Sequence, residues 1–267
     1  ALAAALLVVA EAYNDYLDAT KSRMKRIDCR WLSSYITRPD RGSHWLAARL
    51  GVPRDVAKEI LYALMFGGRR RGAVRDILMD HFNGDIDQVE AGLRRVGYVL
   101  CWKQWGGVPG LVQMLDQLDA VVHAHICRTG PFRKYRKEVK MLPITVNRTR
   151  HGTSILNSVG RSLLVLDQLG RPVTRDDGKR VAKRHVRCHV LQGVEQEFIA
   201  SVVVKISQFP EYVEGNLRVM SQQHDGFVIW SDLPKEKALT IVQECAARAQ
   251  AVTFFREFAI LEEKDFL

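Results

Sequence analysis

The first half of the chain is dominated by apolar residues at helical spacing. Residues 1–34 and the stretch from 73 to 127 show this pattern, so we expect helices there. Residues 36–43 contain a proline and a glycine and are expected to form a loop. A short helix then leads to Pro53, which suits the first turn of a further helix that ends or bends at Gly67–Gly68.

Strand patterns enter in the second half. Short β-rich runs lie between 152 and 170, and a long helix is expected over about 179–206. Residues 218–232 predict a strand, a tight turn at Asp225–Gly226 and a second strand, and a helix follows near Pro234. The predicted fold class is therefore α+β, with a mostly helical block followed by a small antiparallel sheet packed with helices.

The charge of the chain points to a polyanionic partner. The 267 residues carry 40 Lys and Arg against 30 Asp and Glu, a net charge of +10. Residues 128–150 hold eight of these cations, and residues 171–187 hold seven.

The cysteines and the apolar runs indicate the compartment. The five cysteines include no CxxC pair, which indicates reduced thiols. The longest apolar run, residues 1–10, is too short to span a bilayer. We expect an intracellular protein that is neither secreted nor held in a membrane.

A stripe of two cations and two aromatics runs along the helix after Pro53. Arg54, Lys58, Tyr62 and Phe66 follow at steps of four, so they share one helix face. Two cations near a helix start can hold a triphosphate, and the helix dipole helps there. An aromatic one turn further can pack on a sugar, and the next can sit beside a base pair. Taken alone, the stripe is more simply a solvated cationic face running into a partly buried aromatic one.

Two other patterns carry candidate chemistry. Asp225, preceded by His224, is expected at the tip of a β-hairpin, where its carboxylate can bind Mg²⁺. Gln192 begins the exposed side of the long helix, and a glutamine can hydrogen-bond base edges in a minor groove. Singly, an Asp-Gly pair is a good hairpin turn and Gln192 an ordinary surface residue.

In this order and spacing, the blocks resemble the polymerase core of family A DNA polymerases, the group that includes bacterial DNA polymerase I. The family's motif B has Arg, Lys, an aromatic and Tyr-Gly at these intervals, and its motif C is His-Asp-Glu between two strands. Here Phe66 stands for the tyrosine of motif B, and Gly226 for the glutamate of motif C. The matching residues are Arg54, Lys58, Tyr62, Phe66, Gly67, His224 and Asp225.

Smaller matches extend the resemblance from about residue 44 to the end of the chain. The family has a Gln-Gly pair at the start of a palm helix; here Gln192–Gly193 begins 32 residues before His224. The "VGR" of 159–161 resembles the family's "FGR" turn, and 108–115 resembles its "YPG" helix. His44 resembles the histidine that touches the incoming triphosphate.

The resemblance implies template-directed DNA synthesis, in which a primer 3′-hydroxyl attacks the α-phosphate of a bound dNTP with two Mg²⁺ ions as cofactors. Primer–template DNA and dNTP are the implied partners, in the cytoplasm or another DNA-containing compartment. A tyrosine at the position of Tyr62 implies tolerance of dideoxynucleotides. The implied roles are catalysis for Asp225, Lys58 and His224, nucleotide binding for His44, Arg54, Lys58, Tyr62 and Phe66, DNA binding for Gln192, Arg184, Arg161 and Gly67, and metal binding for Asp225.

The resemblance also divides the chain into three regions. Residues 1–43 are expected to adjoin the palm, 44–150 to form the fingers with the motif B helix, and 151–267 to form the distal palm with the motif C hairpin and a C-terminal helix. Together they make a helical fingers subdomain and a palm with a small antiparallel sheet.

The family's motif A, which carries a second metal-binding aspartate, falls by spacing at the start of this sequence. In one placement, residues 6–15 are a degenerate motif A strand with Glu11 or Asp15 as the ligand. In the other, which we favour, residues 1–10 are the helix after motif A. The chain is then expected to belong to a larger or split polymerase, with motif A and the thumb on a second polypeptide.

Three rival classes stay open at this point. A single-subunit RNA polymerase shares Lys58 and the His-Asp pair, but it normally lacks an aromatic at the position of Tyr62. A catalytically inactive, polymerase-derived DNA-binding or structural subunit is favoured by Gly226 and by the unplaced motif A. A membrane-surface protein is disfavoured, because the basic stretches alternate with strand and turn signals.

Overall fold

The structure is a computed structural model of the whole chain. It describes residues 2–38, 42–66, 70–101, 110–127, 142–174, 178, 180–181, 183–222, 226–251 and 253.

The described part of the first 127 residues folds into helices, as the hydrophobic pattern predicts. Pro53 precedes the first turn of one of them, and Asp85 caps another by accepting hydrogen bonds from the backbone N–H groups of Asp87 and Gln88. These elements are α1 (Leu2–Ala19), α2 (Arg30–Ile36), α3 (Gly42–Leu50), α4 (Arg54–Met65), α5 (Arg70–His81), α6 (Ile86–Val96) with a π-helical turn (Gly97–Cys101), and α7 (Leu111–Cys127).

The second half mixes strands with helices, so the predicted α+β class is confirmed. One antiparallel sheet has the order β1-β2-β3, and the other pairs β4 with β5. The elements are β1 (Ile144–Thr149), β2 (Gly152–Asn157), β3 (Ser162–Leu166), α8 (Lys183–Ile206), α9 (Pro210–Val213), β4 (Leu217–Gln222), β5 (Phe227–Ser231) and α10 (Lys235–Gln250).

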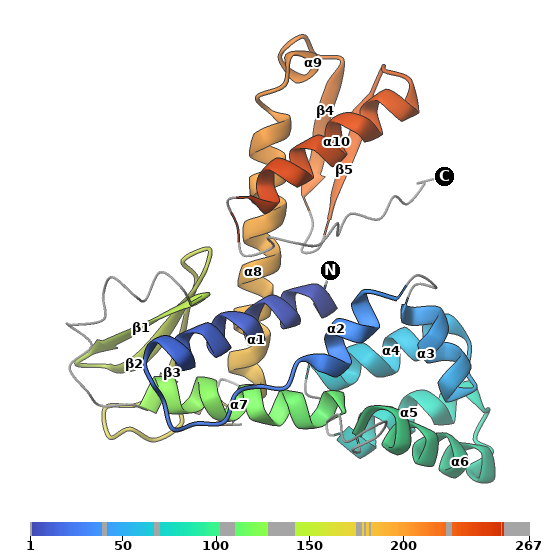
Figure 1. Cartoon of the computed structure of the whole chain (residues 1–267), viewed down its shortest axis with the longest axis vertical. Helices are drawn as coiled ribbons and strands as arrows, with labels where there is room; N and C mark the ends of the chain where they lie inside the picture. Colours follow the sequence, from blue (N-terminus) through green and yellow to red (C-terminus); the bar gives the residue numbers. More distant parts are fainter. Residues whose placement is uncertain are drawn as a thin grey trace.

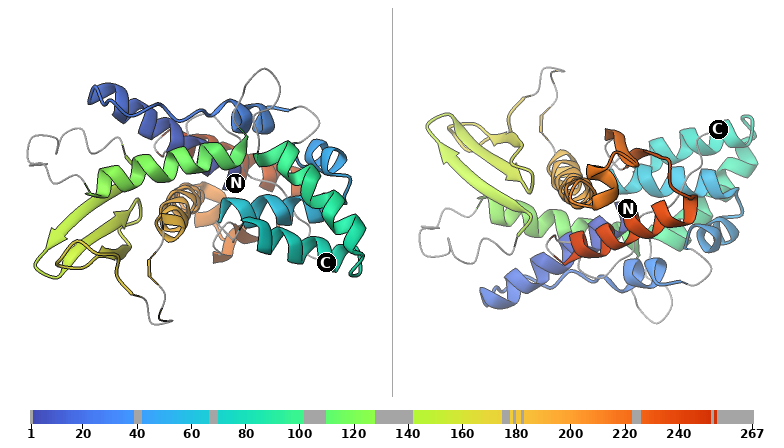
Figure 2. Two further views of the ribbon diagram at one scale, coloured as in Figure 1. Left: turned by 90° about the horizontal axis from the view of Figure 1, so that it is seen from below. Right: turned by 90° about the horizontal axis from the view of Figure 1, so that it is seen from above.

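The long helix α8 joins two parts of the molecule (Figure 1). In the lower block, α1 crosses α8, α7 runs below, the β1–β3 sheet lies on one side and α2–α6 lie on the other. The views along α8 in Figure 2 show the same order, with α8 end-on between the sheet and the helices. The upper unit consists of the far half of α8, α9, the β4–β5 hairpin and α10, which packs against α8.

Helix α1 forms the centre of the lower block. Leu6, Ala10 and Tyr13 are fully buried, because α1 lies among α2, α7 and α8. The strand alternative for residues 6–15 is therefore wrong, since these residues are all helical. Its two candidate ligands, Glu11 and Asp15, lie on the exposed side of α1.

The fold corrects one further expectation. The single helical stretch predicted over 1–34 is two helices, because α1 ends at a left-handed residue, Lys21 (φ 47°), where the N–H of Ser22 donates to the carbonyl of Leu17. The predicted region boundary after residue 150 falls in the turn that joins β1 to β2, so both strands of that hairpin lie in one sheet.

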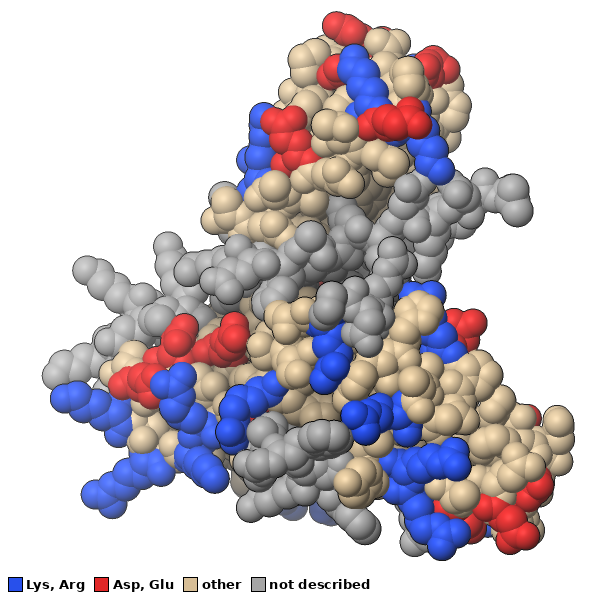
Figure 3. Space-filling model, turned by 45° about the vertical axis from the view of Figure 1, so that its right-hand side comes forward, with Lys and Arg blue, Asp and Glu red and all other residues tan. Residues whose placement is uncertain are grey.

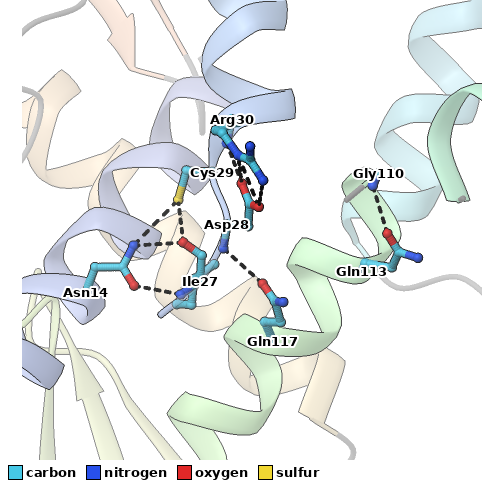
Figure 4. A network of polar contacts seen from close by, with 8 residues as sticks. All are labelled: Asn14, Ile27, Asp28, Cys29, Arg30, Gly110, Gln113 and Gln117. Carbon is cyan, nitrogen blue, oxygen red and sulfur yellow. Dashed lines mark hydrogen bonds and ion pairs between the residues drawn. The ribbon is translucent and has the colours of Figure 1, made fainter. Parts of the chain in front are cut away.

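A buried asparagine fixes the extended segment between α1 and α2 (Figure 4). The Asn14 side chain on α1 accepts a hydrogen bond from the N–H of Ile27 at 2.7 Å and donates one to its carbonyl at 2.9 Å. The next N–H, of Asp28, donates to Oε1 of Gln117 on α7 at 2.9 Å. The segment is thus held between α1 and α7 by hydrogen bonds to side-chain amides, which take the place of hydrogen bonds to a neighbouring strand.

Replacing Asn14 with alanine should lower the free energy of unfolding by about 1–3 kcal/mol, because both backbone groups of Ile27 lose their partners in a buried place. Asp15→Ala, on the exposed side of the same helix, should change it by less than about 0.5 kcal/mol. Urea unfolding of the two variants checks this, and an equal effect would contradict the assigned role of Asn14.

Candidate nucleotide and nucleic-acid site

The predicted stripe on α4 faces outward. Ala57, Ile60 and Leu64 bury the opposite side of the helix in the lower block. Tyr62 and Phe66 stay 43% and 38% exposed, which is unusual for large aromatic side chains on an otherwise well-packed helix. The stripe is therefore a surface that is available for contact, as a nucleotide or base-pair site requires.

Three residues of the stripe share one shallow pocket of about 420 Å³. Lys58 supplies a cation, while Tyr62 and Phe66 supply aromatic surface. The lining also includes two carboxylates, which lower the positive potential around Lys58. The remaining lining residues are Asp55, Glu59 and Ala63 of α4 and Ile77 of α5.

Arg54 and His44 lie at the neighbouring corner between α3 and α4, outside the pocket lining. The Arg54 side chain donates from Nε to Oγ of Ser43 at 3.1 Å, which ties the start of α4 to α3. His44 follows Ser43 directly and is exposed. The structure therefore brings Arg54 and His44 to one corner, next to the pocket that Lys58 lines.

A second stripe runs along α8 and meets the first. Arg184, Cys188 and Gln192 are four residues apart on α8, so they share a face. Gln192 is exposed and the other two are half-buried. The Cys188 thiol lies 3.5 Å from the carbonyl oxygen of Phe66, where the α4 stripe ends. Two stripes that are more than 120 residues apart in sequence thus meet at this contact.

A buried arginine, which the sequence did not single out, holds this junction. Arg187 is 5% exposed; its Nε donates to the carbonyl of Met65 at 3.0 Å, and its Nη1 forms an ion pair with Asp119 of α7 at 2.7 Å. Burial raises the pKa of Asp119 above its ordinary value, and the charge of Arg187 opposes that rise. The only sequence signal was a charged residue on the apolar side of each of two helices.

The turn after β2 is seated on α8 beside the Gln-Gly pair. Asn157 donates from Nδ2 to the carbonyl of His189 at 3.2 Å and accepts at Oδ1 from the N–H of Arg161 at 3.0 Å. A Cβ on Gly193 would lie only 2.6 Å from Cβ of Asn157. The glycine thus permits close contact of helix and turn, and this contact brings exposed Arg161 near the α8 stripe.

Three predicted site residues, Gly67, His224 and Asp225, lie outside the described residues. The strands flanking the predicted motif C are present, with Gln222 paired to Phe227 at their last described register position. In Figure 1 this end of the hairpin points toward the lower block. Among the residues that the structure describes, no group of three His, Cys, Asp or Glu side chains could hold a metal ion.

The positive charge belongs to the part of the molecule that carries both stripes. Residues 205–250 hold five Lys and Arg against six Asp and Glu, so the excess of cations lies elsewhere. Figure 3 shows Lys and Arg spread over the lower block, with Asp and Glu gathered at its left and lower right, and residues of both signs on the upper unit. The lower block is thus the part of the molecule that attracts a polyanion more strongly.

Comparison with protein-family models and with curated proteins finds no match to this chain. The likeness to family A DNA polymerases therefore rests on the residues and spacings named above. Within the described residues, every helix is too short or too polar to cross a lipid bilayer.

Gly193→Ala should lower the free energy of unfolding by about 1–3 kcal/mol, because the added methyl overlaps Asn157. Gly97→Ala is the matched control, since nothing lies within 4 Å of a Cβ there. Combining Gly193→Ala with Asn157→Gly should cost less than the sum of the single changes. Additive costs in urea unfolding would show that the two residues do not meet.

His189 gives this seat a pH dependence. Its Nε2 donates to the carbonyl of Arg161 at 3.0 Å, and burial lowers the pKa of its imidazole below the ordinary value. The unfolded chain then takes up a proton first as the pH falls, so this stability is complete above about pH 6.5 and is lost as the pH falls through the lower, folded pKa. His189→Gln should lose less unfolding free energy than the wild type between neutral and mildly acidic pH; equal losses would contradict this.

Proposed function

We propose that the chain takes part in template-directed DNA synthesis, the transfer of a dNTP to the 3′-hydroxyl of a primer, as part of a larger or split polymerase. The observation that supports this most directly is the meeting of the α4 and α8 stripes at the contact of Cys188 with Phe66. The resemblance implies nucleotide binding for residues of the α4 stripe and DNA binding for Arg184 and Gln192 of the α8 stripe. A polymerase needs the two functions side by side.

The roles follow from the order of side chains along this surface. Arg54 and Lys58, with His44 at the adjoining corner, would hold the triphosphate through charge and hydrogen bonds. The ring of Tyr62 would pack on the sugar, and Phe66, at the end nearest α8, would border the template base.

Beyond Phe66, the α8 stripe would follow the duplex. Gln192 can donate to and accept from base edges in the minor groove, and Arg184 can meet a phosphate or a base acceptor. The excess positive charge of the lower block would hold the backbone, which makes the binding salt-dependent.

Mg²⁺, when bound, supplies the charge that stabilises the leaving pyrophosphate. The residue predicted to hold it, Asp225, lies outside the described residues.

Primer extension with dNTP and Mg²⁺ tests the proposal. The wild type, alone or with a polypeptide that supplies motif A, should extend a primer, Asp225→Ala should abolish extension, and Lys58→Ala should lower kcat/KM for dNTP by about a hundredfold. Lys237→Ala, on α10 of the upper unit, is the matched lysine control and should leave the rate unchanged. Dideoxynucleotides should stop the wild-type reaction, as Tyr62 implies. Primer extension at the wild-type rate in both Asp225→Ala and Lys58→Ala would contradict the assigned site.

A second candidate is a polymerase-derived subunit that binds DNA without catalysis. It is favoured by Gly226 at the place of a glutamate, and by Asp55 and Glu59 in the lining of the pocket, which weaken its hold on a triphosphate. This candidate predicts salt-sensitive binding of primed DNA that survives Asp225→Ala, with no extension by any of the variants.

A further inference from the structure

A cluster of three aromatic rings and two guanidinium groups lies where α2 meets α3. The rings of Trp31 and Tyr35 are stacked, with centroids 5.5 Å apart and planes within 6°. The Trp45 ring lies 6.4 Å from that of Trp31, between centroids. The guanidinium carbons of Arg38 and Arg49 lie 4.2 Å and 5.9 Å from the centroid of Trp45. We call these five residues the α2–α3 platform.

The spacing of these residues and one glycine assemble the platform. Trp31 and Tyr35 are four residues apart on α2, as are Trp45 and Arg49 on α3, so each pair shares a helix face. Gly42 begins α3 directly against α2, because a Cβ there would lie only 2.3 Å from the carbonyl oxygen of Tyr35. This close approach brings the two faces together.

The platform differs from a buried aromatic core. All three rings are half-buried, and Arg49 is exposed. A guanidinium group is weakly hydrated and stacks on flat rings, so Arg38, which lies over the Trp45 ring, and Arg49 add positive charge and planar groups on which a base can stack. Flat rings beside positive charge match the two parts of a single-stranded nucleic acid, whose bases stack and whose phosphates are anionic.

We propose that the α2–α3 platform binds single-stranded nucleic acid, with unpaired bases stacked on the Trp45 surface and phosphates at Arg38 and Arg49. The net charge of +10 attracts any polyanion, whereas half-buried rings at the surface favour bases that are not already stacked in a duplex. None of the platform residues lines the α4 pocket. The platform therefore stands whether or not the chain synthesises DNA.

Binding of a short, dye-labelled oligo(dT) to the whole chain, followed by anisotropy without dNTP or primer, tests the platform. Trp45→Ala and Arg49→Gln should each weaken binding by about tenfold, the loss expected for one stacked base or one close cation. Arg94→Gln is the matched control, because Arg94 is exposed on α6 and its loss changes the charge equally. Its affinity should stay within about twofold of the wild type.

Tryptophan emission gives a readout that depends on stacking. Oligo(dT) should quench the wild type clearly and Trp45→Phe less, and a duplex of equal length should quench weakly. If Trp45→Ala does not fold, Trp45→Phe and Arg49→Gln still test the platform. Equal oligo(dT) affinity in all variants would overturn the platform, and so would equal losses in Arg49→Gln and Arg94→Gln, which indicate general charge attraction.

The two proposals fail separately. If Asp225→Ala loses primer extension but binds oligo(dT) as the wild type does, the result bears on the proposed DNA synthesis and leaves the platform unaffected. Unchanged oligo(dT) binding in Trp45→Ala removes the platform and leaves the extension results as they are.

Discussion

The arrangement of the candidate site depends on the buried charge of Arg187. A guanidinium out of water must be paired and hydrogen-bonded, and here Asp119 and the Met65 carbonyl meet that need. That carbonyl belongs to the last turn of α4, where backbone oxygens lack helical partners and the dipole favours a cation. One side chain of α8 thus links that helix both to the end of α4 and to α7. The Cys188–Phe66 contact, one residue further on each helix, follows from it.

Local pattern was enough to predict most of the elements. The buried side of α4, the long helix α8 and the β4–β5 hairpin each repeat apolar positions at their own period, and the structure has them in place. The outward stripe on α4 was predictable for the same reason, because steps of four fix a shared helix face. So was the α8 stripe that carries Gln192.

What the sequence did not show are contacts between residues far apart in the chain. Spacing says which side chains share a face but not which face lies opposite, so neither Arg187 with Asp119 nor Gly193 with Asn157 was predicted. The break after α1 was missed because the segment beyond it is held by the hydrogen bonds of Asn14 to Ile27, which spacing along the chain does not show. The helical spacing of apolar residues continues through this segment, because that spacing indicates which residues are buried and not whether the backbone is helical.

The continuity of α8 has a mechanical consequence. Its described helix runs unbroken from Lys183 to Ile206, with the Arg187 junction near one end and the upper unit at the other. The 19 helical steps from Arg187 to Ile206 span roughly 28 Å, so a tilt of about 5° at the junction would carry the far end through roughly 2.5 Å. Small changes in the packing of α4, α7 and α8 at the junction are thus amplified along α8. They set the distance between the β4–β5 hairpin and the lower block.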